Sequence, residues 1–169
     1  ALAVAAIAAL SFVSVQAKAD LITNGGFETG DFTGWTANAV SFPMYVDTTT
    51  VHSGSFAAQI AGFDFGPDTL TQSISTANGQ AYVLSFWRFQ FAGEPTGLDV
   101  TWNGNSVFSE SFASGTNPNG QPYQQFTANV IGTGNDQLVF TSYQNPAFTY
   151  LDDVSLNIAA VPEPSTWAM

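Results

Sequence analysis

Few residues of this chain could act in catalysis, and their arrangement does not resemble a known catalytic site. The chain has one histidine, His52, and no cysteine. His52 lies in a Ser-Gly turn, which favours a structural role over that of a general base. Glu94 and Glu110 could be the two acids of a glycosidase, but no neighbouring residue marks a raised pKa for either. Because a Gly-x-Ser-x-Gly turn is also missing, we predict that the protein is not an enzyme.

Aromatic residues beside planar polar side chains could support different chemistry, the binding of sugars. The C–H faces of sugars stack on aromatic rings, and their hydroxyl groups need directed hydrogen-bond partners. The candidates are Trp87, Trp102, Tyr123 and Tyr143, together with Arg88 and neighbouring glutamines. Aromatic residues of β-sandwiches belong to the core more often than to a binding surface. Each position is therefore interpreted in two ways, as a binding platform or as part of the core.

Short β-rich runs carry these residues and are separated by Gly, Asn, Pro and Asp. No run has helical periodicity long enough to form a helix. The predicted strands cover residues 44–51, 56–61, 69–75, 81–91, 97–102, 123–131, 137–143 and 149–158. Segments 77–80, 103–105 and 132–135 contain residues that tolerate a positive φ and are predicted turns. This pattern predicts an all-β fold, an antiparallel β-sandwich.

Alternation along residues 81–91 assigns side chains to two faces of one strand. Tyr82, Leu84 and Phe86 share one face, while Trp87 and Phe89 share the other. Both faces are apolar. We therefore expect a central strand that is buried by the opposing sheet on one side and lines a partly covered surface or groove on the other.

Composition limits the partners. The net charge is −11, which opposes contact with the phosphates of nucleic acids and with anionic lipid headgroups. Without cysteine the chain can form neither a disulfide nor a thiolate metal site. Charged residues make up only 9% of the chain. The neutral, hydrogen-bonding exterior that remains suits contact with sugars or with other matrix chains.

The first residues have the features of a secretion signal. Residues 1–15 are apolar or small, and Ala17-Lys18-Ala19 has the small-x-small pattern that a signal peptidase cleaves. We predict a signal peptide at residues 1–19, incomplete at its start, and a β-sandwich domain at residues 20–158. The alternative is a buried N-terminal helix, which the short alanine-rich run fits less well.

The last residues read Val161-Pro162-Glu163-Pro164-Ser165-Thr166-Trp167-Ala168-Met169. This segment resembles the sorting motif of the PEP-CTERM family, and we assign residues 159–169 to it. The resemblance implies processing by an exosortase-type enzyme and transient membrane anchoring through a helix that would follow Met169. It also implies the envelope, outer surface or extracellular matrix of a Gram-negative bacterium that makes exopolysaccharide. The alternative is an ordinary proline-rich tail.

Four motifs span the predicted domain: Asn24-Gly25-Gly26-Phe27-Glu28, Gly34-Trp35, His52-Ser53-Gly54-Ser55, and Tyr150-Leu151-Asp152-Asp153-Val154-Ser155-Leu156. Together they resemble galactose-binding-like jelly-rolls, including carbohydrate-binding modules of the 4/9 type. The resemblance implies a structural Ca²⁺ held by Glu28, by Asp152 or Asp153, and by carbonyls near Ser53. Calcium prefers six to eight oxygen ligands of this kind. Asp152 shares its strand parity with inward Val154, which favours it over Asp153. The alternatives are solvated turn residues, or hydrogen bonds to the backbone without an ion.

These observations predict an exported, non-catalytic protein of the cell surface or extracellular matrix. Its jelly-roll would bind exopolysaccharide through an aromatic groove. The alternative is a structural or adhesive envelope protein with no specific glycan ligand, because a fold does not determine a function.

Overall fold

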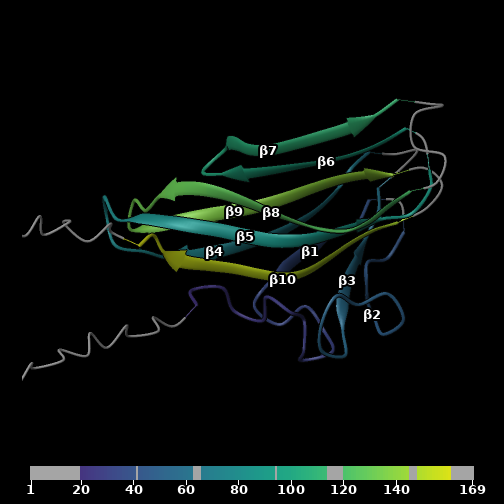
Figure 1. Cartoon of the computed structure of the whole chain (residues 1–169), viewed down its shortest axis with the longest axis horizontal. Helices are drawn as coiled ribbons and strands as arrows, with labels where there is room; N and C mark the ends of the chain where they lie inside the picture. The colour runs from purple at the N-terminus through teal and green to yellow at the C-terminus, as the bar shows by residue number, and fades with distance from the viewer. Residues whose placement is uncertain are drawn as a thin grey trace, which may run out of the picture.

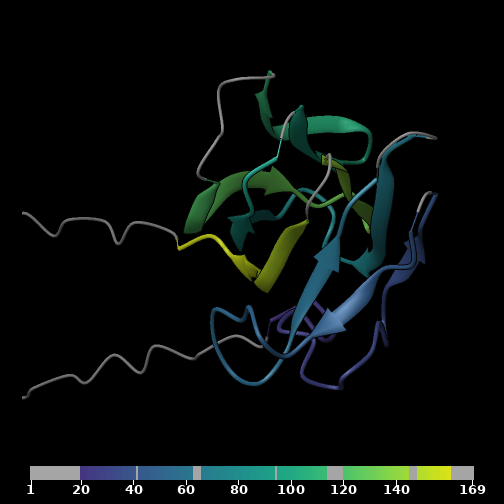
Figure 2. The ribbon, with the colours of Figure 1, turned by 90° about the vertical axis from the view of Figure 1, so that its right-hand side faces the viewer.

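The fold is all-β. A computed structural model describes residues 20–40, 42–62, 66–93, 95–113, 120–144 and 148–160. Within these residues the chain forms ten β-strands and no helix, and Figure 1 shows the strands stacked in two layers. The turned view in Figure 2 looks along most of the long strands. All strand pairs are antiparallel, so the predicted antiparallel β-sandwich is confirmed.

Each layer is a sheet of five strands. In spatial order, the sheet that we call the β9 sheet contains β1 (Thr36–Asn38), β4 (Asp68–Ser75), β9 (Asn135–Gln144), β6 (Thr96–Trp102) and β7 (Asn105–Phe112). The second, the β10 sheet, contains β2 (Tyr45–Asp47), β3 (Ala57–Ile60), β10 (Thr149–Ile158), β5 (Ala81–Gln90) and β8 (Gln121–Ile131). Each sheet therefore has one outer face, which is where a ligand could reach it.

The core lies between the sheets. Tyr82, Leu84 and Phe86 of β5 are buried, as the alternation of this strand predicts. The ring of Phe86 meets Phe140 of β9 edge to face, with 5.2 Å between the ring centroids. Such contacts between alternate residues of facing sheets hold the two layers together.

Two strands escaped the sequence analysis, β1 and β7. Both are edge strands: β1 has three exposed residues, and β7 alternates serine with partly buried residues. The turn before β7 was predicted, and there Asn103 and Gly104 have φ values of 51° and 77°. Two successive positive φ values suit the tight turn of a β-hairpin, which joins β6 to β7.

A β-bulge interrupts β10. Asp152 pairs with Trp87, but the next pair along the strands joins Ser155 to Ser85. Asp153 lies within the bulge, with a φ of 47°. The extra residue reverses the alternation. Asp152 therefore lies on the outer side of the sheet with Trp87, and the expectation that it shares a face with Val154 is wrong.

The segment before β1 runs beside the second half of β10. The amide of Leu21 donates to the carbonyl of Leu156 at 3.1 Å, and the amide of Val154 donates to the carbonyl of Gly25 at 3.0 Å. A Cβ atom on Gly25 would lie 1.9 Å from the carbonyl oxygen of Val154. Only glycine permits this approach.

Some predictions fall outside the described residues: the signal peptide at 1–19, Glu94, and the sorting motif with Pro162, Glu163 and Pro164. In the part of the chain that the structure describes, no helix has the length and apolar character needed to cross a membrane.

Candidate functional site

Residues from both ends of the domain meet at the turn of residues 52–56. The carboxylate of Glu28 accepts hydrogen bonds from the amides of Ser55, at 2.9 Å, and Phe56, at 3.1 Å. The carboxylate of Asp152 accepts from the amides of His52, at 2.8 Å, and Ser53, at 3.1 Å. Two acids far apart in the sequence thus hold the same turn from two sides.

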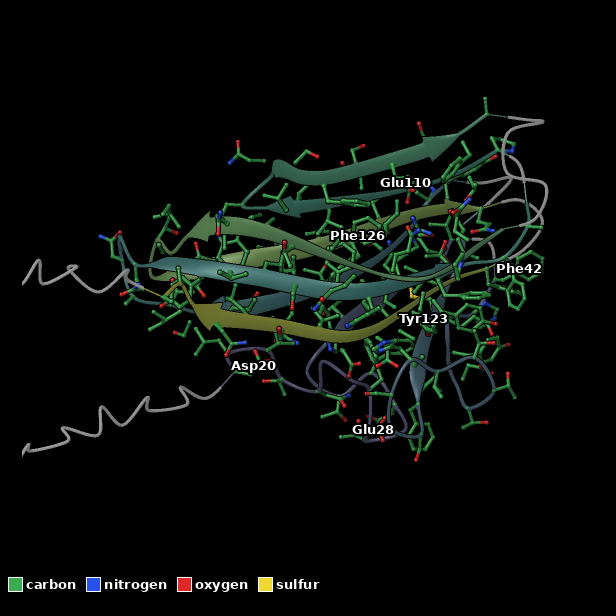
Figure 3. All side chains as sticks on the ribbon, in the orientation of Figure 1. Asp20, Glu28, Phe42, Glu110, Tyr123 and Phe126 are labelled. Atoms are coloured by element: carbon green, nitrogen blue, oxygen red, sulfur yellow. The ribbon has the colours of Figure 1, made fainter. Side chains whose placement is uncertain are left out.

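Asp153 completes this group. Its Oδ1 accepts from the hydroxyl of Ser53 at 2.8 Å, and its Oδ2 bonds to Nδ1 of His52 at 2.7 Å. All three acids surround Gly26: a Cβ atom there would lie 3.6–3.8 Å from atoms of Glu28, Asp152 and Asp153. The structure therefore brings together the residues that were predicted to hold calcium, and Figure 3 shows Glu28 in the loops below β10.

The oxygen atoms of these acids are of the class that calcium prefers, and in this structure they are engaged in hydrogen bonds. Every carboxylate oxygen of the three acids accepts from an N–H or O–H group or bonds to the His52 ring. Among the described residues, no group of three acidic, histidine or cysteine side chains is placed to hold a metal. Burial raises the pKa of Asp152. The geometry gives these acids a hydrogen-bonding role, and structural calcium stays a prediction.

His52 covers an aromatic residue of the sheet beneath it. Its ring stacks on Trp87 with 3.6 Å between centroids and an angle of 17° between planes. Tyr123 meets the edge of His52, and its hydroxyl donates to the carbonyl of Thr50 at 3.0 Å. Burial, followed by the nearby charge of Asp152, raises the pKa of Tyr123. The ring and the hydroxyl of Tyr123 therefore both contact the segment that contains Thr50 and His52, and the ring is not free to stack on a sugar.

A hollow of about 340 Å³ opens beside Trp87 on the outer face of the β10 sheet. We call it the Trp87 hollow. Its lining comes from the N-terminal segment, β10, β5 and β8, and consists of Asp20, Gly25, Gly26, Ser85, Trp87, Gln125, Asp153, Val154 and Ser155. Of the predicted sugar-binding residues, only Trp87 lies there.

A second hollow, of about 240 Å³, lies on the outer face of the β9 sheet. Two cross-strand rows build it. Tyr143, Gly97 and Ser111 are register partners across β9, β6 and β7, and so are Thr141, Asp99 and Ser109. We call it the Tyr143 hollow, because it presents one aromatic ring among hydroxyl groups and a carboxylate.

Gly97 opens the Tyr143 hollow. Its neighbours in the row, Tyr143 and Ser111, have side chains, whereas Gly97 has none, so the row is lowest at its centre. A Cβ atom at Gly97 would approach the carbonyl oxygen of Glu110 to 3.1 Å and would occupy part of this space.

Trp102 belongs to the core, so its predicted role as an exposed platform is corrected. Only 5% of its surface is exposed, and its indole Nε1 donates to the carbonyl of Ile131 at 3.0 Å. The sequence held a signal for this outcome. Trp102 alternates in phase with Leu98 and Val100, which are buried as well.

Arg88 is also an interior residue, and its predicted contact with sugar is corrected. Its exposed fraction is 0%, it forms an ion pair with Glu110, and its guanidinium lies 5.2 Å from the ring centroid of Phe126. Burial lowers the pKa of Arg88, and the charge of Glu110 opposes that effect. Figure 3 shows Glu110 and Phe126 on the side of the sandwich where β7 and β8 lie. Arg88 thus lies in the interior and cannot reach a ligand on an outer face, whereas Glu110 is partly exposed and borders the Tyr143 hollow.

The polar partners of Tyr143 were not among the residues predicted to bind sugar. Asp99, Thr141 and Ser109 line the hollow, and Oδ1 of Asp99 accepts from the hydroxyl of Ser106 at 2.7 Å. Their signal was the polar half of the alternation in β6 and β9. That half predicts an outer face but does not say which strands are neighbours.

No protein-family model matches the sequence, and no curated protein matches it significantly. Solved structures do match. TmCBM61, a carbohydrate-binding module solved with β-1,4-galactotriose, has a TM-score of 0.61 and 18% identity, covering 84% of this chain and 100% of that chain. The CBM22-1 xylan-binding domain of Xyn10C from Paenibacillus barcinonensis has a TM-score of 0.55 and 15% identity, covering 81% and 93%.

The similarity also extends to an enzyme. The Stig cyclase Fisc from Fischerella sp. TAU has a TM-score of 0.60 and 14% identity, covering 84% of this chain and 98% of that chain. At such identities the comparison shows the fold alone. The chain has the jelly-roll sandwich fold that carbohydrate-binding modules share.

Proposed function

We propose that this protein is a non-catalytic domain that binds polysaccharide in the Tyr143 hollow. The observation that carries the proposal is the cross-strand row in which Gly97 separates the ring of Tyr143 from Ser111. Among the described residues, the row places an aromatic ring beside a gap on the outer face of the β9 sheet.

The neighbouring row supplies the polar groups that a sugar needs. Neighbouring strands lie roughly 4.8 Å apart, so Thr141, Asp99 and Ser109 form a line of hydroxyl and carboxylate oxygens across three strands. Hydroxyls both donate and accept hydrogen bonds, whereas a carboxylate only accepts. Such a line suits a ligand with many hydroxyl groups.

The fold and the charge support the same proposal. Modules of this fold include one solved with galactotriose and one described as xylan-binding. The net charge of −11 favours neutral glycans over acidic ones. The hypothesis therefore concerns neutral polysaccharide, with exopolysaccharide of the producing cell as the candidate.

The test is binding of Tyr143→Ala to neutral polysaccharides, measured by pulldown and calorimetry. We expect affinity to fall about tenfold, close to the roughly 1.4 kcal/mol of the strongest aromatic contacts. The matched control is Tyr45→Ala, because Tyr45 is a 54% exposed tyrosine of the other sheet. Equal affinities of the two variants would contradict the proposed site. No binding to any polymer, together with weaker biofilm cohesion on gene deletion, would favour a structural or adhesive protein instead.

We also propose that the protein is exported and sorted. The apolar run of residues 1–15, the Ala17-Lys18-Ala19 pattern and the Pro162-Glu163-Pro164 motif support this proposal. Mass spectrometry of the exported protein should find Asp20 as the first residue. Replacing Pro162 and Pro164 by alanine should leave an unprocessed C-terminus, and normal processing would argue against an exosortase-type enzyme.

A further inference from the structure

We propose that the Trp87 hollow is a second sugar-binding site, on the face opposite to the Tyr143 hollow. Together, two such sites would let one domain hold two polysaccharide chains and cross-link them; this part rests on the proposed function. The Trp87 hollow as a sugar site rests on its own lining residues.

The ring of Trp87 lines the hollow in a fixed orientation. It is half-buried, and the stacked ring of His52, which is bonded to Asp153, keeps it in place. Within the described residues no acceptor bonds to the indole N–H of Trp87, so this donor is available to a ligand. A fixed ring loses little conformational freedom when a sugar stacks on it.

Polar side chains surround the Trp87 ring, and some of their hydrogen-bonding atoms have no partner among the described residues. Gln125 is exposed, and its side chain makes no hydrogen bond to another described residue. Oδ1 of Asp20 accepts from the amides of Ile22 and Leu156, but its Oδ2 has no partner in the described part of the chain. Ser85 and Ser155 add two hydroxyls that bond to each other at 2.8 Å. A free amide, free acceptors and hydroxyls around an aromatic wall suit a sugar unit.

The charge of the lining selects the class of sugar. Asp20 and Asp153 both line the hollow, and no Lys or Arg does. Arg88, the sole Lys or Arg within the described residues, is buried and paired with Glu110. A uronic acid or a sulfated sugar would meet two carboxylates without a compensating base. The hollow is therefore assigned to sugars without an acidic group.

The two hollows cannot serve one straight chain. One lies on the outer face of the β9 sheet and the other on the outer face of the β10 sheet, with the whole core between them. Stacked sheets alone are about 10 Å apart. Two occupied sites therefore mean two ligands, and with long polymers they mean cross-linking.

The experiment is calorimetric stoichiometry with β-1,4-galactotriose and with xylohexaose as probes. Gln125→Arg places a bulky side chain at the rim of the Trp87 hollow. Its matched control is Asn129→Arg, an exposed position on the same face of β8 that does not line the hollow. We expect two sites per wild-type chain, two in Asn129→Arg, and one each in Gln125→Arg and Tyr143→Ala. Trigalacturonic acid should bind the Trp87 hollow at least tenfold more weakly than galactotriose does.

The outcomes separate the two proposals. A single wild-type site that Tyr143→Ala removes and Gln125→Arg retains would overturn the second site and leave the proposed function intact. A single site that only Gln125→Arg removes would support the Trp87 hollow and move the binding function away from Tyr143. Equal losses in Gln125→Arg and Asn129→Arg, or no binding of either probe, would overturn the Trp87 site. Light scattering of long xylan should rise with wild-type protein and stay low with either single-site variant.

Discussion

The outer faces of the two sheets differ in what covers them. On the β9 sheet, exposed Ser109 and partly exposed Thr141 lie around Tyr143, and we call this the uncovered face. On the β10 sheet, the segment around residues 50–56 covers the outer side, and Asp152 and Tyr150 there are 0% and 5% exposed. A position on the first face can therefore serve a ligand alone, whereas a position on the second also holds the fold. Substitutions on the β9 sheet should therefore change binding with little effect on stability, whereas substitutions under the segment of residues 50–56 should lower stability as well.

The largest expected difference between the two faces is the effect of glycine substitutions on the free energy of unfolding. Gly25→Ala places a Cβ atom 1.9 Å from the carbonyl oxygen of Val154 and forces the N-terminal segment away from β10. We expect the free energy of unfolding to fall by about 3 kcal/mol. Gly97→Ala, whose new atom lies 3.1 Å from the nearest oxygen, should cost about 0.5 kcal/mol and weaken sugar binding instead. Urea denaturation measures both, and equal losses would erase the distinction between the faces.

Calcium binding would add to the stability of the covered face of the β10 sheet. An ion that binds only the native state stabilises it by about 2.7 kcal/mol at 100 times its Kd. If Glu28 and either Asp152 or Asp153 hold calcium, as the resemblance to galactose-binding-like jelly-rolls implies, CaCl₂ should raise the melting temperature and EDTA should lower it, while Glu28→Gln should respond to neither. Identical melting temperatures of the wild type in both solutions would rule out the ion and leave hydrogen bonds as the role of these acids.

Asp152→Ala tests the hydrogen bonds of the covered face. The substitution leaves the partly buried amides of His52 and Ser53 without their acceptor. An unsatisfied buried group costs roughly 1–3 kcal/mol, and loss of a desolvated charge offsets part of it, so we expect about 2 kcal/mol of destabilisation. Asp99→Ala on the uncovered face should cost no more than about 0.5 kcal/mol. A larger loss of stability in Asp99→Ala than in Asp152→Ala would contradict the proposed difference between the two faces.

The smallest expected effect is a difference in pH dependence between two buried aspartates. Burial raises the pKa of Asp152 above its ordinary value of 3.8. Burial also acts on Asp136 of the β9 sheet, but hydrogen bonds from Thr76, Asn103 and Thr133 outweigh it and lower the pKa of Asp136 below 3.8. The native state thus binds its proton on Asp152 more tightly, and that on Asp136 less tightly, than the unfolded chain does.

These shifts act in opposite directions on stability. As the pH falls toward 3.8, Asp152 becomes protonated first in the native state, so the destabilisation by Asp152→Ala should grow. Below pH 3.8, Asp136 loses its contribution, so the destabilisation by Asp136→Ala should shrink. Urea titrations of both variants between pH 3 and 7 measure the slopes. Slopes of the same sign would show that the two sites are not electrostatically different.

Much of the architecture could be predicted, because local patterns determine it. Strand β10 has the predicted bounds, and the Asn103-Gly104 turn has the φ values that its residues permit. Alternation in β5 correctly placed Tyr82, Leu84 and Phe86 inside. Side-chain alternation follows from strand geometry alone and needs no knowledge of the partner strand.

The sites depend on contacts that no local pattern contains. Tyr143 and Trp102 look alike as strand aromatics, and only their pairing partners decide that one lines a hollow and the other a core. Asp152 meets His52 across 100 residues of chain. A bulge reversed the parity from which its direction was inferred.

The amino-acid sequence alone therefore determined most of the strands, the predicted turns and the scarcity of charged groups on the surface, since these follow from backbone geometry and side-chain chemistry within a few residues. Strand order, the cover over the β10 sheet and the two hollows were decided by tertiary structure. The physical reason is that a hollow forms between side chains of neighbouring strands, and the choice of neighbours minimises the free energy of the whole sandwich rather than that of any segment.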